Sequence, residues 1–198
     1  MSVPCEFHLR PIVAEDQPFL WEMLYQALYV PEGAPRPPRE VVRQPELARY
    51  VQDWGQDGDI GVLAVEAGTQ RPVGAAWVRL LAGAQRGYGY VNDETPELSI
   101  AVLPDYRGRG IGTRLLAALL QAAQTRYGAI SLSVTRGNPA VALYRRLGFA
   151  TVAEDNTSLT MLRTGPVATD SLWTESTTVK TYETDLNRRW SPSCFFPA

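Results

Sequence analysis

Residues 102–122, VLPDYRGRGIGTRLLAALLQA, place a glycine-rich loop between two ordered segments. An apolar run ends at Pro104, and a leucine-rich stretch with helical spacing follows Gly112. Gly108, Gly110 and Gly112 allow a close approach to the backbone, because glycine has no side chain. A loop that opens a helix also leaves N–H groups available to an anion, above all phosphate. The stretch therefore predicts a site for a phosphate-bearing ligand; the alternative is a tight turn with solvated arginines.

Two common phosphate-binding motifs do not fit this loop. A Walker loop ends in Gly-Lys-Ser/Thr, whereas residues 110–113 read Gly-Ile-Gly-Thr. A dinucleotide-binding fold requires G-x-G-x-x-G and an acidic residue about 20 positions later. Here the glycines read G-x-G-x-G, and the next strand-like segment, SLSVTRG (131–137), ends without an acid. Both alternatives are therefore disfavoured.

A third interpretation rests on two separate stretches, which resemble motifs of the GNAT superfamily of acetyl-CoA-dependent N-acetyltransferases. Residues 102–112 are similar to motif A, a strand ending V-x-P followed by R/Q-x-x-G-x-G/A at a helix start. NPAVALYRRLGF (138–149) resembles motif B, an Asn, an Ala-rich helix, a Tyr and then Leu-Gly-Phe. The resemblance covers about residues 6–163, and residues 164–198 have no recognised counterpart.

The resemblance implies an α/β (α+β) GNAT fold: a mixed, mostly antiparallel sheet with helices on both faces and splayed central strands. Apolar periodicity and turn residues predict elements in the same order. The expected strands are 6–12, 59–66, 73–81, 97–103, 130–134, 149–153 and 158–162, and the expected helices are 15–29, 45–54, 110–127 and 139–147. We expect an acetyltransferase domain at 1–163. Eleven of residues 164–198 are Ser or Thr, so this tail is expected to be disordered or docked.

Composition narrows the functional class further. The chain has 198 residues and a formal net charge of −2, which disfavours a general nucleic-acid binder. It lacks a run of 18 apolar residues, so no membrane span is expected. The two cysteines, Cys5 and Cys194, favour a reducing cytoplasm over a disulfide framework. With His8 as the single histidine, neither a zinc site nor a Ser-His-Asp triad is expected.

The resemblance also implies which residues bind acetyl-CoA as a cosubstrate. In the family, the pyrophosphate lies on backbone amides of the glycine loop and the pantetheine arm pairs with the strand before it. The implied cofactor-binding residues are Ile100, Ala101, Val102, Arg107, Gly108, Arg109, Gly110, Ile111, Gly112 and Thr113. Asn138 stands where the family contacts CoA, and it is also a suitable N-cap for the following helix.

Acetyl transfer to an amine requires loss of a proton from the amine, stabilisation of an oxyanion and protonation of the leaving thiolate. Tyr144 occupies the family's general-acid position, and a backbone amide near Val102 would meet the oxyanion. Glu97 is the candidate general base; an ordinary solvated carboxylate at a strand end is the equal alternative. Asp93 and Glu94 could instead bind a cationic substrate.

The sequence says less about which residues bind the acceptor amine. The family places the acceptor between the first helices and the loop before the central strand. The corresponding residues are Tyr25, Tyr29, 31–38, Tyr88, Tyr90, Asn92 and Asp93. They suit a small amine or a peptide amine equally, and a homodimer is left open.

Two other functional classes are alternatives to an acetyltransferase. The first is a non-catalytic acyl-CoA-binding sensor or scaffold, which would keep the glycine loop without needing Tyr144. The second is a protein-interaction domain that uses the Ser/Thr-rich tail, for which the sequence has no positive motif.

Overall fold

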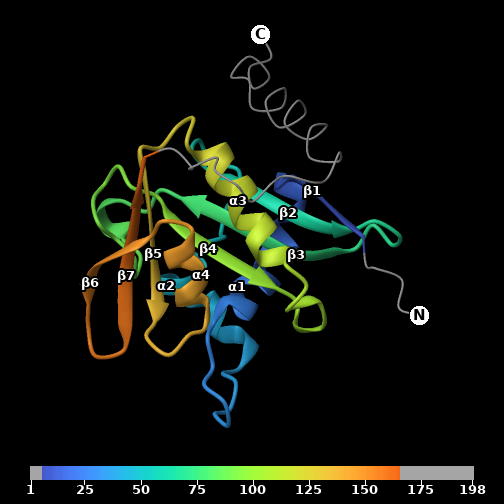
Figure 1. Ribbon diagram of the computed structural model, residues 1–198, viewed down its shortest axis with the longest axis horizontal. Helices are drawn as coiled ribbons and strands as arrows, with labels where there is room; N and C mark the ends of the chain where they lie inside the picture. Colours follow the sequence, from blue (N-terminus) through green and yellow to red (C-terminus); the bar gives the residue numbers. More distant parts are fainter. Residues whose placement is uncertain (1–5, 166–198) are drawn as a thin grey trace.

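The computed structural model describes residues 6–165, which form one seven-stranded sheet with helices on both faces (Figure 1). Its spatial order is β1-β2-β3-β4-β5-β7-β6, and every neighbouring pair is antiparallel except β4 and β5. The strands are β1 Phe7–Pro11, β2 Ile60–Glu66, β3 Pro72–Arg79, β4 Glu97–Val102, β5 Ala129–Thr135, β6 Ala150–Glu154 and β7 Ser158–Thr164. The expected architecture is thus confirmed. The last strand reaches the expected domain boundary, and residues 166–198 of the tail lie outside the described residues.

The α-helices are α1 Gln17–Ala27, α2 Pro45–Ala48, α3 Ile111–Ala123 and α4 Ala140–Arg146. Short 3-10 turns add η1 Ala14–Asp16, η2 Arg39–Arg43, η3 Gly83–Gln85 and η4 Pro104–Tyr106. On one face, α3 buries Leu115, Leu116 and Leu119 against the sheet, and Tyr144 of α4 belongs to the same core. On the other face, Leu20 and Met23 of α1 pack around Trp77 of β3. The spacing of the apolar residues in α1 and α3 explains why each presents one face to the sheet.

Residues 45–54 form much less helix than the sequence predicts. α2 spans only Pro45–Ala48, and turns follow it. The Arg79 guanidinium donates hydrogen bonds to the carbonyls of Arg49, Gln52 and Asp53, at 3.0, 2.5 and 3.1 Å. These carbonyls are therefore satisfied by a side chain of β3, which replaces the backbone hydrogen bonds of a longer helix. The helix expected at 110–127 is also shorter, because residues after Ala123 turn toward Gly128.

Arg79 forms a buried ion pair with Asp59 beneath these turns. Its Nε and Nη2 atoms lie 2.8 and 2.5 Å from the two Asp59 carboxylate oxygens, and both residues are less than a tenth exposed. Asp59 also accepts hydrogen bonds from the amides of Gly55 and Gln56, each at 3.0 Å. A buried ion pair of this kind is stable only when its remaining hydrogen-bonding groups are satisfied, as they are here.

β6 forms one edge of the sheet, and all five of its residues are exposed. Its pairing with β7 shifts register between Thr151 and Ala153. This edge is therefore short and irregular.

Replacing Asp59 by Ala should destabilise the protein by about 3–5 kcal/mol, because Arg79 would stay buried without a counter-charge. The matched control is Asp57→Ala, which removes the exposed ion pair between Asp57 and Arg126. This control should change stability little, since exposed pairs contribute little. Urea denaturation of both variants measures the difference in stability. Equal midpoints would show that the Arg79–Asp59 ion pair is no more important for stability than the exposed pair.

Candidate active site

β4 and β5 are the two parallel strands at the centre of the sheet, and they diverge almost at once. They are paired at Glu97 and Ser131, where the Ser131 amide donates to the Pro96 carbonyl at 3.0 Å. Beyond this point β4 stays paired with β3 and β5 stays paired with β7. A gap therefore opens between two strands that each keep one complete partner.

The pairing of β4 with β3 determines which backbone groups face this gap. The Leu103 amide donates to the Val73 carbonyl at 2.9 Å, so odd-numbered residues of β4 direct their backbone groups to β3. The backbone N–H and C=O of Ile100 and Val102 consequently point toward the gap. Ala101, which the sequence places in the same cofactor-binding set, directs these groups to β3 and buries its side chain in the core on the α1 face.

The glycine loop lies directly after β4 and leads into α3. Gly108 and Gly110 have φ values of +73° and +77°, which side chains disfavour, and Gly110 is the N-cap of α3. Within residues 6–165, and apart from the adjacent residues in the chain, no atom lies within 4 Å of a Cβ placed at either glycine, so the space beside both is open. Gly112 lies inside the helix, where a Cβ would make an ordinary contact of 3.9 Å with Ile100. The positive end of the α3 dipole and the first amides of the helix, which have no partner within the helix itself, therefore face this space.

The two arginines of the loop are not simply projecting charges. The Arg107 Nε donates to the Val102 carbonyl at 2.9 Å, and its Nη2 donates to Gln26 of α1 at 3.2 Å. The Arg109 Nη2 donates to the Asp105 carbonyl at 2.8 Å. These hydrogen bonds hold the loop against β4 and α1 and keep positive charge near the start of α3.

The remaining loop residues differ in what they can offer a ligand. The Ile111 side chain is buried in the core, so only its backbone is available to a ligand. Thr113 is half-buried on the first turn of α3. Of the predicted loop residues, those from Arg107 to Gly110 are exposed, whereas Gly112 is half-buried.

Tyr144 projects from α4 into the core that α3 shares with the sheet. Its ring is 8% exposed and packs edge-on against Phe149, with ring centroids 5.9 Å apart. Among residues 6–165, no group hydrogen-bonds to its hydroxyl, and burial raises the pKa of Tyr144 to about 12. The hydroxyl therefore stays protonated at neutral pH and keeps its hydrogen for donation. Asn138, at the start of this helix, accepts a hydrogen bond from the Ala140 amide at 2.9 Å and thus acts as a cap.

The carboxylate of Glu97 is buried at the point where β4 and β5 meet. Its Oε2 accepts hydrogen bonds from the Tyr50 hydroxyl at 2.8 Å and from the Gly89 amide at 2.7 Å. Its Oε1 is buried and has no hydrogen-bond partner in the described chain. Burial raises the pKa of Glu97, although these two bonds and the nearby Gly87 amide oppose the rise. Glu97 is 2% exposed, and its role as a base stays a prediction.

Tyr50 is a residue that the sequence analysis missed. Burial and the Glu97 carboxylate raise its pKa, so the hydroxyl remains protonated. The same oxygen accepts a hydrogen bond from the Tyr88 amide at 2.8 Å. No local sequence motif identifies Tyr50, because its partners Tyr88 and Glu97 lie 38 and 47 positions further along the chain.

The predicted acceptor residues fall into two groups. In the first, the Tyr25 hydroxyl donates to the Pro37 carbonyl at 2.9 Å, and the Tyr29 hydroxyl donates to the Gly137 carbonyl at 3.2 Å. Tyr25 thus supports the loop after α1. Tyr29 links the end of α1 to the loop between β5 and α4.

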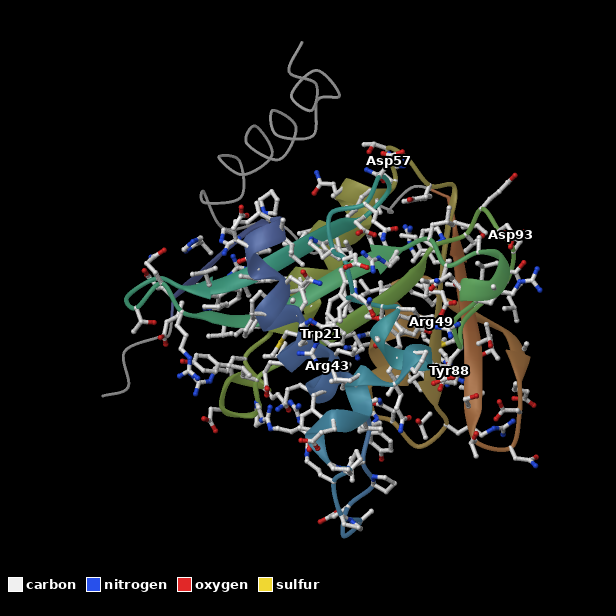
Figure 2. All side chains as sticks on the ribbon, turned by 180° about the vertical axis from the view of Figure 1, so that it is seen from behind. Trp21, Arg43, Arg49, Asp57, Tyr88 and Asp93 are labelled. Carbon is white, nitrogen blue, oxygen red and sulfur yellow. The ribbon has the colours of Figure 1, made fainter. Side chains whose placement is uncertain are left out.

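The second group lies in the loop between β3 and β4. The Tyr90 hydroxyl donates to Asp93 at 2.8 Å, and the Asn92 side chain accepts from the Glu94 amide at 3.0 Å. These polar groups hold their own loop. Tyr88 is instead 62% exposed, and Figure 2 labels it together with Arg49 and Asp93.

A separate hollow of about 490 Å³ lies between α1 and the segment that contains η2 and α2, and it is lined by none of these residues. Its walls include Trp21 and Arg43, and the Arg43 guanidinium lies 3.8 Å from the centre of the indole ring (Figure 2). Within the described residues, no group of three His, Cys, Asp or Glu side chains is arranged to hold a metal ion. None of the helices in residues 6–165 is long and apolar enough to cross a membrane.

Comparison with known families agrees with this geometry. Residues 21–149 match the model of the acetyltransferase (GNAT) family. The chain belongs to the GNAT family. The matched residues include β4, the glycine loop, β5 and Tyr144.

Named relatives include a streptothricin acetyltransferase from Streptomyces lavendulae, 36% identical over 57% of this chain and 61% of the relative. A mycothiol acetyltransferase from Propionibacterium freudenreichii is 35% identical over 54% of this chain and 32% of the relative. The chain thus matches less than two thirds of either protein.

Solved GNAT structures share the fold at low sequence identity. The ribosomal-protein-S18-alanine N-acetyltransferase of Escherichia coli has a TM-score of 0.56 and 19% identity, covering 85% of this chain and all of that chain. The PaiA N-acetyltransferase of Thermoplasma acidophilum, solved with coenzyme A, has a TM-score of 0.57 and 17% identity. That match covers 81% of this chain and 99% of the neighbour.

The loop glycines should respond differently to an added methyl group. Gly110→Ala should destabilise the protein by about 1 kcal/mol, because alanine disfavours a positive φ. Gly112→Ala should be neutral or stabilising by up to about 1 kcal/mol, because glycine is unfavourable in a helix and the added methyl group has room. Melting temperatures of the two variants test this, and a larger loss for Gly112→Ala would contradict the loop geometry.

Proposed function

We propose that this protein is an acetyl-CoA-dependent N-acetyltransferase that moves an acetyl group to a primary amine by direct attack. The observation that carries the proposal is the gap between β4 and β5, which opens beside a glycine loop at the N-terminus of a 13-residue helix. Tyr144 supplies a proton donor from the helix that follows β5.

The residues present fit acetyl-CoA. Ile100 directs a backbone donor and acceptor into the gap, and Val102 adds its N–H, since Arg107 already bonds the Val102 carbonyl. An extended pantetheine arm would bind the Ile100 groups as an additional strand would, which leaves the Val102 N–H for the thioester. The amides around Gly108 and Gly110, with the α3 dipole and the two arginines, would hold the pyrophosphate.

Acetyl-CoA would supply a thioester carbonyl carbon for the amine to attack. In this proposal the Val102 N–H, which points into the gap, stabilises negative charge on the carbonyl oxygen. Tyr144 donates its proton to the departing sulfur as the carbon–sulfur bond breaks. Its raised pKa keeps the proton in place across the neutral and mildly alkaline range.

The group that takes the amine's proton is a separate question. Glu97 is the base expected from the sequence, and its raised pKa would suit that role. Residues 87–89, however, cover its carboxylate. The amine could instead arrive already neutral.

The acceptor is proposed as a class, a primary amine. The relatives named for streptothricin and mycothiol acetylation suggest the first acceptors to test. Spermidine belongs in the same panel, because a spermidine/spermine N-acetyltransferase shares the fold.

Acetyl-CoA binding should depend on the charge of a side chain introduced at position 110. Asn and Asp have the same shape and both tolerate a positive φ, so Gly110→Asn and Gly110→Asp differ mainly in charge. At low salt the Asp variant should bind acetyl-CoA about tenfold or more weakly than the Asn variant, because its carboxylate would repel the pyrophosphate. Calorimetry measures both affinities, and wild-type affinity in Gly110→Asp would overturn this binding site.

Removing the Tyr144 hydroxyl should separate binding from turnover. Tyr144→Phe should bind acetyl-CoA normally, while turnover falls roughly 10²-fold. The measurement is CoA release with the amine panel. Unchanged turnover of an accepted amine would exclude Tyr144 as the acid. A wild-type protein that binds acetyl-CoA but releases CoA with no amine would instead favour a non-catalytic acyl-CoA-binding module.

A further inference from the structure

Residues 86–89, in the long loop between β3 and β4, are held at their backbone from two directions. From the end of α2, the Arg49 Nη1 donates to the Arg86 carbonyl at 2.5 Å, and the Tyr50 hydroxyl accepts from the Tyr88 amide. From β4, Glu97 accepts from the Gly89 amide. Backbone hydrogen bonds at three of these four residues, Arg86, Tyr88 and Gly89, thus fix the path of this segment.

The two glycines show how closely the segment passes. A methyl group added at Gly87 would lie 2.3 Å from the Tyr50 hydroxyl oxygen and 2.5 Å from the Glu97 Oε1. One added at Gly89 would lie 2.7 and 2.8 Å from backbone atoms of Leu132 and Ser133 in β5. These distances are too short for any Cβ. The segment therefore runs between the carboxylate and β5, next to the residue at which β5 leaves β4.

The α2 side of this arrangement is itself anchored to the sheet. The Trp77 Nε1 donates to the Tyr50 carbonyl at 2.9 Å, and Arg79 donates to the Arg49 carbonyl. Trp77 is fully buried, and Arg79 belongs to the buried ion pair with Asp59. Tyr50 and Glu97 are thus held by the same sheet, one through β3 and the other through β4.

We propose that Glu97 and Tyr50 form a clamp on residues 87–89, so that Glu97 is a positioning residue for acetyl transfer. The clamp fixes the wall of the gap and presents the exposed Tyr88 side chain to the acceptor amine. This rests on the proposed acetyltransferase function for its consequence, although the clamp itself is a property of the free protein. The Glu97 Oε2 accepts one hydrogen bond from Tyr50, the other member of the clamp, and one from Gly89 of the clamped segment. The Glu97 Oε1 faces Gly87.

Hydrogen exchange on the free protein tests the clamp. In Tyr50→Phe the Tyr88 amide should exchange about tenfold faster or more, because its acceptor is removed. Glu97→Ala should do the same for the Gly89 amide. Glu97→Gln keeps an acceptor oxygen and the side-chain shape, so Gly89 should stay within about threefold of wild type.

The chain offers two controls for this experiment. Tyr90→Phe removes a hydroxyl that donates to the exposed Asp93 in the same loop, and it should leave the Tyr88 and Gly89 amides unchanged. The Gln85 amide, bonded to the Ala82 carbonyl, should keep its exchange rate in every variant. If Glu97→Ala fails to fold, Tyr50→Phe and Glu97→Gln decide. Wild-type exchange at Tyr88 in Tyr50→Phe would overturn the clamp.

Kinetics with an amine that is turned over separate a clamp from a base. A clamp predicts that Tyr50→Phe raises the KM for the amine, while Glu97→Gln keeps kcat within about threefold and leaves its pH profile unchanged. If Glu97 were the base, Glu97→Gln would lower kcat by about 10²-fold or more with normal exchange at Gly89, and the positioning assignment would be overturned. If no amine is acetylated, the proposed function fails, and the exchange data still decide the clamp.

Discussion

The site depends on one constraint, that β4 and β5 meet at a single residue pair and then separate. Each strand keeps its other neighbour, so the gap does not unravel the sheet. Backbone groups of Ile100 and Val102 are left facing a space that another strand would fill. Buried backbone groups need partners, so such a gap favours an extended ligand with its own donors and acceptors. The glycine loop begins where this space ends, and it leads to the N-terminus of α3, a position that favours an anion.

The local parts of this arrangement could be predicted from the sequence. The glycine loop, the helix after it and the Asn138 cap depend on residues close together in the chain, and the structure contains all three. The length of α2 could not be predicted, because the carbonyls that follow this helix are bound by Arg79, which lies 26 to 30 positions away in the chain. Hydrophobic periodicity indicates which secondary structure a segment favours by itself. It does not show which side chains from distant parts of the chain will contact that segment.

The same limit applies to Glu97 and the acceptor residues. A carboxylate at the start of a strand looks solvated in sequence, yet Tyr50 and Gly89 enclose it. In sequence, Asp93 is a candidate to bind a cationic substrate and Asn92 is a candidate acceptor-site residue. In the structure both side chains accept hydrogen bonds from within their own loop. In both cases a distant contact, or a turn closing on itself, decides what the polar group does.

The outer strand β6 has a consequence for the protein at high concentration. A long, straight sheet edge offers a row of unpaired N–H and C=O groups to any other chain, and this promotes aggregation. β6 is five residues long, and its register shifts between Thr151 and Ala153. The shift interrupts the row of backbone groups after two residues. A neighbouring molecule therefore finds no continuous template at this edge, even though every residue of the strand is exposed to solvent.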